Sequence, residues 1–122
     1  MNKQVGEHLR DLAAKGRLIA LGGNLHSQRK QAMIPSLTFA PAGAFVGNGI
    51  KTVMIVPAHD GTAWNCTESC GAHKDKAFTG IEAGELMDGS AYGHDYLYGL
   101  DEVTASPPAR AAVNPEASPP AH

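Results

Sequence analysis

The last nineteen residues constrain the fold of this chain more than any other feature of its sequence. Residues 104–122 hold five of the eight prolines and repeat Ala-Ser-Pro-Pro-Ala at 105–109 and 117–121. Proline has no backbone N–H to donate, and a segment of this composition favours polyproline II or disorder over a packed core. The sequence therefore predicts a single small globular domain at residues 1–103, followed by an extended Pro/Ala-rich tail at 104–122.

The first segment has the period of an amphipathic helix. Apolar side chains recur at Val5, Leu9 and Leu12, which places them on one stripe of a 3.6-residue repeat. Asn2 suits the N-cap position, and Gly16 suits the end of a helix. We therefore expect an N-terminal amphipathic helix.

Residues 32–58 favour β structure, with the strongest turn signal of the chain at Asn48-Gly49. Both residues accept the positive φ of a type I′ turn, and residues 50–56 are rich in β-branched side chains. The pattern predicts a hairpin at 44–56 as the centre of a small antiparallel sheet.

Other segments carry weaker signals. We expect a short strand at 17–21, a short helix at 81–87 and a final strand through Tyr96, Tyr98 and Leu100, within an otherwise irregular C-terminal half. The predicted fold class is α+β.

Cys66, Cys70 and His73 form the pattern Cys-x3-Cys-x2-His in a polar loop. Thiolates and imidazole are ligands that suit zinc or iron, and His59, Asp60 or His94 would have to supply a fourth ligand. A Cys66–Cys70 disulfide is a second interpretation; it requires a loop, because residues four apart on a helix lie too far apart to be bridged. Two reduced, unpaired cysteines are the third. The sequence leaves all three open.

Candidate catalytic residues are weaker. His94-Asp95 suggests an acid–base pair or a calcium loop, but neighbours on a strand point to opposite faces, and a solvated turn is the simpler interpretation. Tyr92, Tyr96 and Tyr98 suggest either a binding platform or ordinary packing. We find no nucleophile motif and no phosphate-binding glycine motif. The chain is therefore expected to lack enzymatic activity.

The charges are unevenly distributed along the chain. Residues 1–31 carry a net charge of +4, residues 77–109 carry −6, and the whole chain carries −2. This balance argues against nucleic-acid binding by bulk positive charge, and its polarity favours association of positive with negative patches. No run of eighteen apolar residues and no secretory signal are present, so we expect no membrane span and synthesis in the cytoplasm.

Together these features favour a non-enzymatic structural or accessory subunit of a larger homo- or hetero-oligomeric assembly, with the tail as its arm. A small virion decoration protein or a complex-stabilising chain would fit. The alternative is a small metal-binding or redox protein, with zinc the leading metal, built on Cys66, Cys70 and His73 with His59 as a further ligand.

Overall fold

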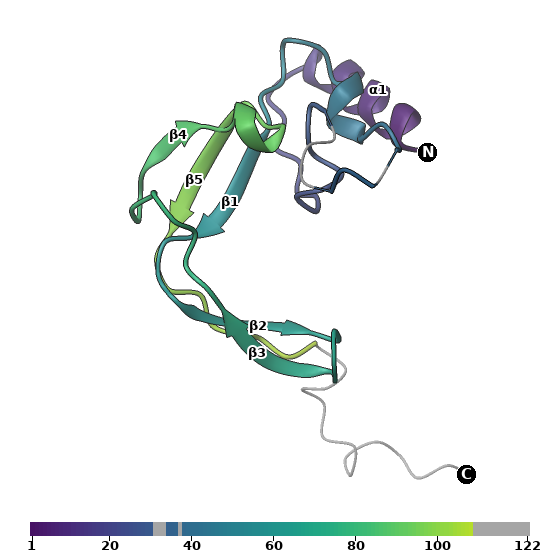
Figure 1. Ribbon diagram of the computed structural model, residues 1–122. Coiled ribbons are helices and arrows are strands. Elements are labelled where there is room, and N and C mark those ends of the chain that lie inside the picture. Colours follow the sequence, from purple (N-terminus) through teal and green to yellow (C-terminus); the bar gives the residue numbers. More distant parts are fainter. Residues whose placement is uncertain (31–33, 37, 109–122) are drawn as a thin grey trace, which may run out of the picture.

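The computed structural model describes residues 1–30, 34–36 and 38–108 and confirms the α+β class (Figure 1). Of the predicted tail, only residues 104–108 fall within this part; 109–122 lie outside it. The elements are α1 (Asn2–Ala13), the 3₁₀ helices η1 (Ala42–Phe45) and η2 (Ser90–Tyr92), and the strands β1 (Val53–Pro57), β2 (Gly61–Asn65), β3 (Gly71–Asp75), β4 (Leu86–Asp88) and β5 (Tyr96–Leu100).

Helix α1 confirms the N-terminal periodicity and packs against η1. The closest approach is at Gly6, where an added Cβ would overlap the carbonyl oxygen of Ala42. Only Gly6 is fully buried in the helix, and the predicted apolar stripe stays half-exposed at Val5 and Leu12. The helix therefore keeps part of its apolar surface accessible.

The central sheet has the strand order β1-β5-β4. β1 pairs with β5 in parallel, β4 pairs with β5 antiparallel, and the registers place Val53 beside Tyr96 and Leu86 beside Tyr98. Alternation along the strands sends Met54, Val56 and Leu97 to one face, where they form the core cluster with Ile81. Phe78 and Met87 pack against this cluster.

The predicted 44–56 hairpin is wrong. Residues 42–45 form η1, and residues 53–57 pair in parallel with β5 rather than with the preceding segment. Gly47 has the positive φ of 74°, whereas Gly49 does not have one. Tertiary contacts override the local turn preference of Asn48-Gly49. Ala42 and Gly43 are buried, and η1 packs against α1. Arg29 donates to the carbonyls of Gly47 and Ile50.

Three further predictions meet different outcomes. The final strand is confirmed as β5, but residues 17–21 form no strand and residues 81–87 form no helix. The strand predicted at 50–56 is present as β1, and the C-terminal half that was expected to be irregular contains the four strands β2, β3, β4 and β5 of the described part. Parallel pairing across a long stretch of chain has no local turn signal, which is why the sequence pattern missed it.

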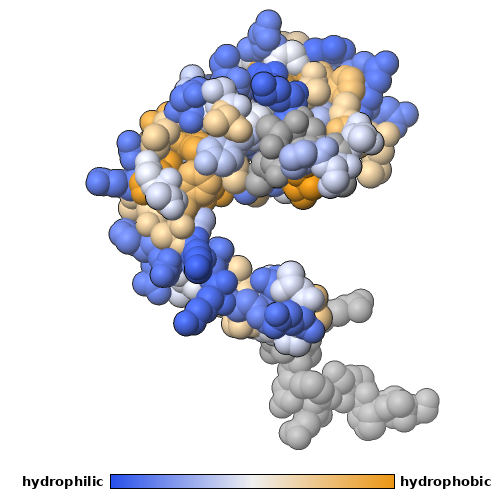
Figure 2. All heavy atoms as spheres, viewed as in Figure 1, coloured by the Kyte–Doolittle hydropathy of each residue, from blue (hydrophilic) through white to orange (hydrophobic). Residues whose placement is uncertain are grey.

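The antiparallel hairpin of this fold is β2–β3, which projects away from the central sheet (Figure 1). The chain leaves β1 at Pro57 and returns at Phe78, whose N–H donates to the Pro57 carbonyl at 2.8 Å. On the face shown in Figure 2, the hairpin surface is mostly hydrophilic, and apolar residues gather over the sheet and the N-terminal body. The hairpin is thus a polar extension that contributes nothing to the core cluster.

Candidate functional site

The tip of the hairpin is closed by a disulfide between Cys66 and Cys70, whose Cα atoms lie 3.9 Å apart. The connection between β2 and β3 is a loop rather than a helix, which is the geometry that the disulfide interpretation requires. Asn65 tightens the turn, because its Oδ1 accepts hydrogen bonds from the N–H and the hydroxyl of Thr67. Residues 66–70 are exposed, so the tip is a small constrained loop open to solvent.

His73 lies against this loop. Its Nε2 is 2.7 Å from the Ser69 carbonyl oxygen, next to Cys70 in the chain. The structure therefore brings together three of the residues that the sequence suggested as ligands. Within the described part of the chain, no group of three or more His, Cys, Asp or Glu side chains is arranged to hold a metal ion. In this loop the two sulfur atoms are bonded to each other.

His59, the suggested fourth ligand, lies at the other end of the hairpin. It precedes β2, and its Nδ1 is 2.7 Å from Oδ1 of Asp101. The N–H of Glu102 and the His59 ring both bond to the Asp101 carboxylate and lower the pKa of Asp101. Asp60 is also at this end, where its Oδ1 accepts from the Ala77 N–H. The structure does not bring His59 or Asp60 to the cysteine loop.

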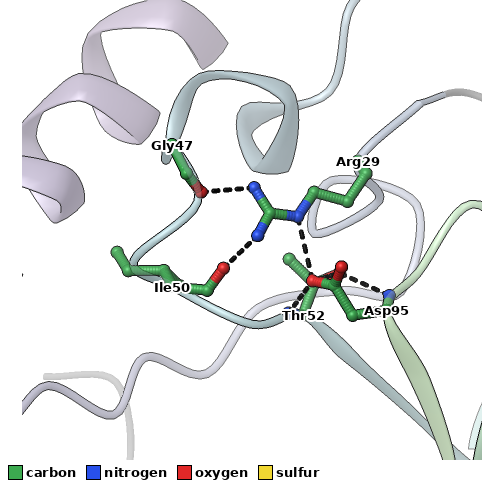
Figure 3. A network of polar contacts seen from close by, with 5 residues as sticks. All are labelled: Arg29, Gly47, Ile50, Thr52 and Asp95. Atoms are coloured by element: carbon green, nitrogen blue, oxygen red, sulfur yellow. Dashed lines mark hydrogen bonds and ion pairs between the residues drawn. The ribbon is translucent and has the colours of Figure 1, made fainter.

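A second polar cluster, which the sequence did not suggest, joins the N-terminal body to the central sheet (Figure 3). Arg29 Nε donates to Asp95 Oδ2 at 2.9 Å, and the same carboxylate oxygen accepts from the Thr52 N–H at 2.8 Å. Burial alone would raise the pKa of Asp95, but the hydrogen bonds from Thr52 and Arg29 outweigh it and lower the pKa. All three guanidinium nitrogens of Arg29 donate to oxygen atoms of the protein (Figure 3). The cluster therefore suits a structural role, as a clamp that holds the N-terminal body against the central sheet.

His94 corrects the expectation of a solvated turn. Its side chain is only 2% exposed, and Nε2 bonds to the Asn24 carbonyl at 3.0 Å, so this nitrogen carries the proton. Nδ1 is buried and has no hydrogen-bond partner among the described residues. Burial lowers the pKa of His94, because desolvation disfavours the charged ring. His94 and Asp95 have separate partners and do not form an acid–base pair.

The beginning of the tail is bound to the hairpin. The Thr62 N–H donates to the Val103 carbonyl at 2.8 Å, and the Ala105 N–H donates to Thr62 Oγ1 at 2.8 Å. Gly61 permits this approach, since a Cβ there would overlap the Val103 carbonyl oxygen. The segment that leaves β5 therefore follows β2 away from the core cluster (Figure 1).

No protein-family model matches this chain, and no curated protein or solved structure gives a match. None of the helices in the described ranges combines the length and apolar character needed to cross a bilayer. Functional inference therefore rests on the surfaces and clusters described above.

Proposed function

We propose that this protein is a structural or accessory subunit of a larger assembly, such as a virion or a multisubunit complex, and that its C-terminal segment is the arm that contacts a neighbour. The observation that carries the proposal is the path of residues 102–105. The contacts of Val103 and Ala105 with Thr62 hold this part of the chain against the projecting hairpin and away from the core cluster.

The chemistry of the tail supports this role. A proline-rich segment loses less conformational entropy on binding than a flexible one, and it docks through side-chain packing because its prolines donate no backbone hydrogen bonds. The small core cluster and the polar hairpin also suit a chain that works by presenting surfaces rather than by enclosing a substrate.

Truncation after Pro108 tests the proposal. This deletion keeps the bonds that Val103 and Ala105 make with Thr62, whereas truncation after Val103 would remove one of them. We expect the 1–108 chain to melt at the temperature of the full chain and to be lost from the high-mass fraction when tagged versions are purified from the source cells and sedimented.

A tail of the same length and composition with its prolines separated is the matched control. We expect this control to enter the high-mass fraction less than the full chain but more than the 1–108 chain, since it keeps the composition of the tail but loses the Pro-Pro pairs. Equal incorporation of the full and 1–108 chains would refute the arm, and a large drop in melting temperature would show that the tail stabilises its own domain.

The position of His73 favours a second candidate, a metal-binding loop that forms on reduction. Reduction of the disulfide would yield two thiols beside the imidazole of His73, and thiolates with imidazole form a donor set that zinc prefers. In this proposal His59 takes no part, because it lies at the far end of the hairpin beside Asp101.

Zinc titration of the reduced and the oxidised protein tests whether a zinc site forms on reduction and whether His73, rather than His59, contributes to it. We expect zinc uptake only after reduction, weakened by His73→Gln and unchanged by the matched variant His59→Gln. Equal zinc binding by oxidised and reduced protein, or loss of binding in His59→Gln, would refute this site.

A further inference from the structure

The disulfide at the tip of the hairpin lies apart from the core cluster. Residues 66–70 are exposed, and the core cluster is formed by other parts of the chain. The bridge links residues only four positions apart, and the stabilisation that a disulfide gives to a fold grows with the length of the loop it closes. Exposed disulfides are open to attack by thiols and are among the more easily reduced. We therefore expect this bridge to open without unfolding of the central sheet.

The hairpin holds the two cysteines together even when their bond is opened. Cys66 directly follows β2 and Cys70 directly precedes β3, and the last pair of the two strands is Asn65 with Gly71. Opening the bond leaves these strands paired, so the two thiols stay close to each other. Groups held in this way react with each other as if each were present at high concentration.

Hydrogen bonds within the loop hold its shape independently of the sulfur atoms. Thr67 donates to Asn65 Oδ1 from its N–H at 3.2 Å and from its hydroxyl at 2.8 Å. Nε2 of His73, in β3, bonds to the Ser69 carbonyl oxygen at 2.7 Å. These bonds favour the loop shape in which the bridge can form again after it has been opened.

We propose that the Cys66–Cys70 loop is a reversible thiol–disulfide exchange site for external thiols. An incoming thiolate attacks one of the two sulfur atoms and forms a mixed disulfide with it. The bond between Cys66 and Cys70 breaks, and its electron pair leaves with the other cysteine as a thiolate. A second external thiolate then attacks the external sulfur of the mixed disulfide and frees the remaining cysteine. Two external thiols are thereby oxidised to one disulfide, and the loop gains two electrons and two protons.

The same geometry drives the reverse step. After the first attack, the freed thiolate lies beside the mixed disulfide because β2 and β3 remain paired. It attacks the cysteine sulfur of the mixed disulfide, restores the Cys66–Cys70 bond and expels the external thiolate. The mixed disulfide is therefore short-lived, and the state of the loop follows the ratio of thiol to disulfide around the protein.

This inference goes beyond the two functions proposed above and does not involve residues 109–122. Exchange would supply the reduced loop that the zinc site requires, but it needs no metal, so each measurement below is made with a chelator present. If glutathione fails to open the bridge, the zinc site can still be tested after reduction by a phosphine. If the reduced loop takes up no zinc, exchange is unaffected. The proposals therefore fail separately.

Mass spectrometry of acid-quenched samples measures the exchange of the full chain with glutathione. The rate in native buffer should lie within about tenfold of the rate in concentrated urea, because the sulfur atoms are already accessible in the folded protein. Circular dichroism during the reaction checks that the protein stays folded. A native rate more than about tenfold below the rate in urea would overturn the proposal, since exchange would then require unfolding.

Single-cysteine variants test the reverse step. Cys66→Ser and Cys70→Ser, treated with glutathione disulfide, should each retain a glutathione mixed disulfide, because no second thiol remains to expel it. The reduced parent treated in the same way should return to the internal disulfide, with less than about a tenth of the protein as mixed disulfide. Accumulation of the mixed disulfide in the parent to the level of the variants would overturn the proposal.

Asn65→Ala tests whether the loop holds the two thiols together. It removes the acceptor of both Thr67 hydrogen bonds and should lower the equilibrium constant for re-forming the bridge, measured against glutathione, by about threefold or more. Asn48→Ala, at an exposed position in the loop before β1, is the matched control and should leave this constant unchanged. Equal constants for Asn65→Ala and the parent would overturn the role of the loop.

A folded protein with one exposed cysteine is the second probe, and it separates protein thiols from small thiols. Because the hairpin projects from the central sheet, we expect this probe to react as well as glutathione (Figure 1). Reaction with glutathione alone would assign the site to small thiols, and reaction with both probes would extend it to a cysteine of a neighbouring protein. Reaction with neither would overturn the proposal.

Discussion

Replacing Arg29 with methionine should destabilise the protein substantially, because this side chain joins three separate segments. It bonds to Asp95 at the start of β5 and to the carbonyls of Gly47 and Ile50 in the loop before β1. Methionine keeps the apolar stem of the side chain but removes the charge and all its donors. The Asp95 carboxylate and both carbonyls then lose a partner.

The magnitude follows from the burial of the pair. The side chains of Arg29 and Asp95 are 22% and 25% exposed, so water replaces the lost hydrogen bonds only in part. A hydrogen bond to a charged group contributes about 1.5–3 kcal/mol net, and breaking a fully buried ion pair costs about 3–5 kcal/mol. We therefore expect Arg29→Met to lower the free energy of unfolding by about 2–4 kcal/mol.

Urea denaturation followed by circular dichroism measures this change. Arg10→Met is the matched control, because Arg10 pairs with Asp11 at 3.6 Å on the surface with side chains 53% and 67% exposed. The control should change the free energy of unfolding by less than about 0.5 kcal/mol. Equal effects of Arg29→Met and Arg10→Met would refute the view that the Arg29 cluster is a structural clamp.

Two further predictions concern Gly61 and His94. Gly61→Ala should destabilise the hairpin by about 1–3 kcal/mol, because the new Cβ overlaps the Val103 carbonyl oxygen, whereas Gly71→Ala at the start of β3 meets no atom within 4 Å and should be tolerated. Burial lowers the pKa of His94 below its ordinary 6.5, so the unfolded chain takes up the proton first as the pH falls. The free energy of unfolding should therefore decrease below about pH 6.5, by at most about 1.4 kcal/mol per pH unit from this residue, and His94→Gln should remove that dependence.

A specific result would contradict each of these two predictions. Similar melting temperatures for Gly61→Ala and Gly71→Ala would show that residues 103–105 do not lie against β2 in solution. A stability that is constant between pH 7 and pH 5 in the parent, or the same pH dependence in His94→Gln, would contradict the buried neutral state of His94.

Local periodicity predicted the elements whose side chains repeat regularly along the sequence, even though their packing partners are distant in the chain. The stripe of Val5, Leu9 and Leu12 gave the position of α1, and alternation at Tyr96, Tyr98 and Leu100 gave β5. The Asn48-Gly49 signal failed because Arg29 and the packing of η1 beside α1 hold this loop in another conformation. No local pattern contains that information.

The candidate sites divide in the same way, into those that a local sequence pattern predicts and those that depend on residues far apart in the chain. Cys66, Cys70 and His73 lie close together in sequence, and their spacing was enough to predict that they are neighbours in space, although His73 lies in β3 rather than in the loop. The Arg29–Asp95 pair joins residues 66 positions apart, so no spacing rule could have found it. His94 was misjudged for the same reason, since the carbonyl that accepts its hydrogen bond belongs to Asn24, 70 positions away in the chain.

The parallel pairing of β1 with β5 has a consequence for biosynthesis. Thr52 and Asp95, which bond at the start of this pair, are 43 positions apart. At a synthesis rate of about 5–20 residues per second, β1 waits on the order of 2–9 s at the ribosome before its neighbour has been translated. During that interval β5, which supplies Leu97 to the core cluster, is not present to cover the apolar side chains of β1. Nascent chains of this protein are therefore expected to need protection from a chaperone until residue 100 has left the exit tunnel.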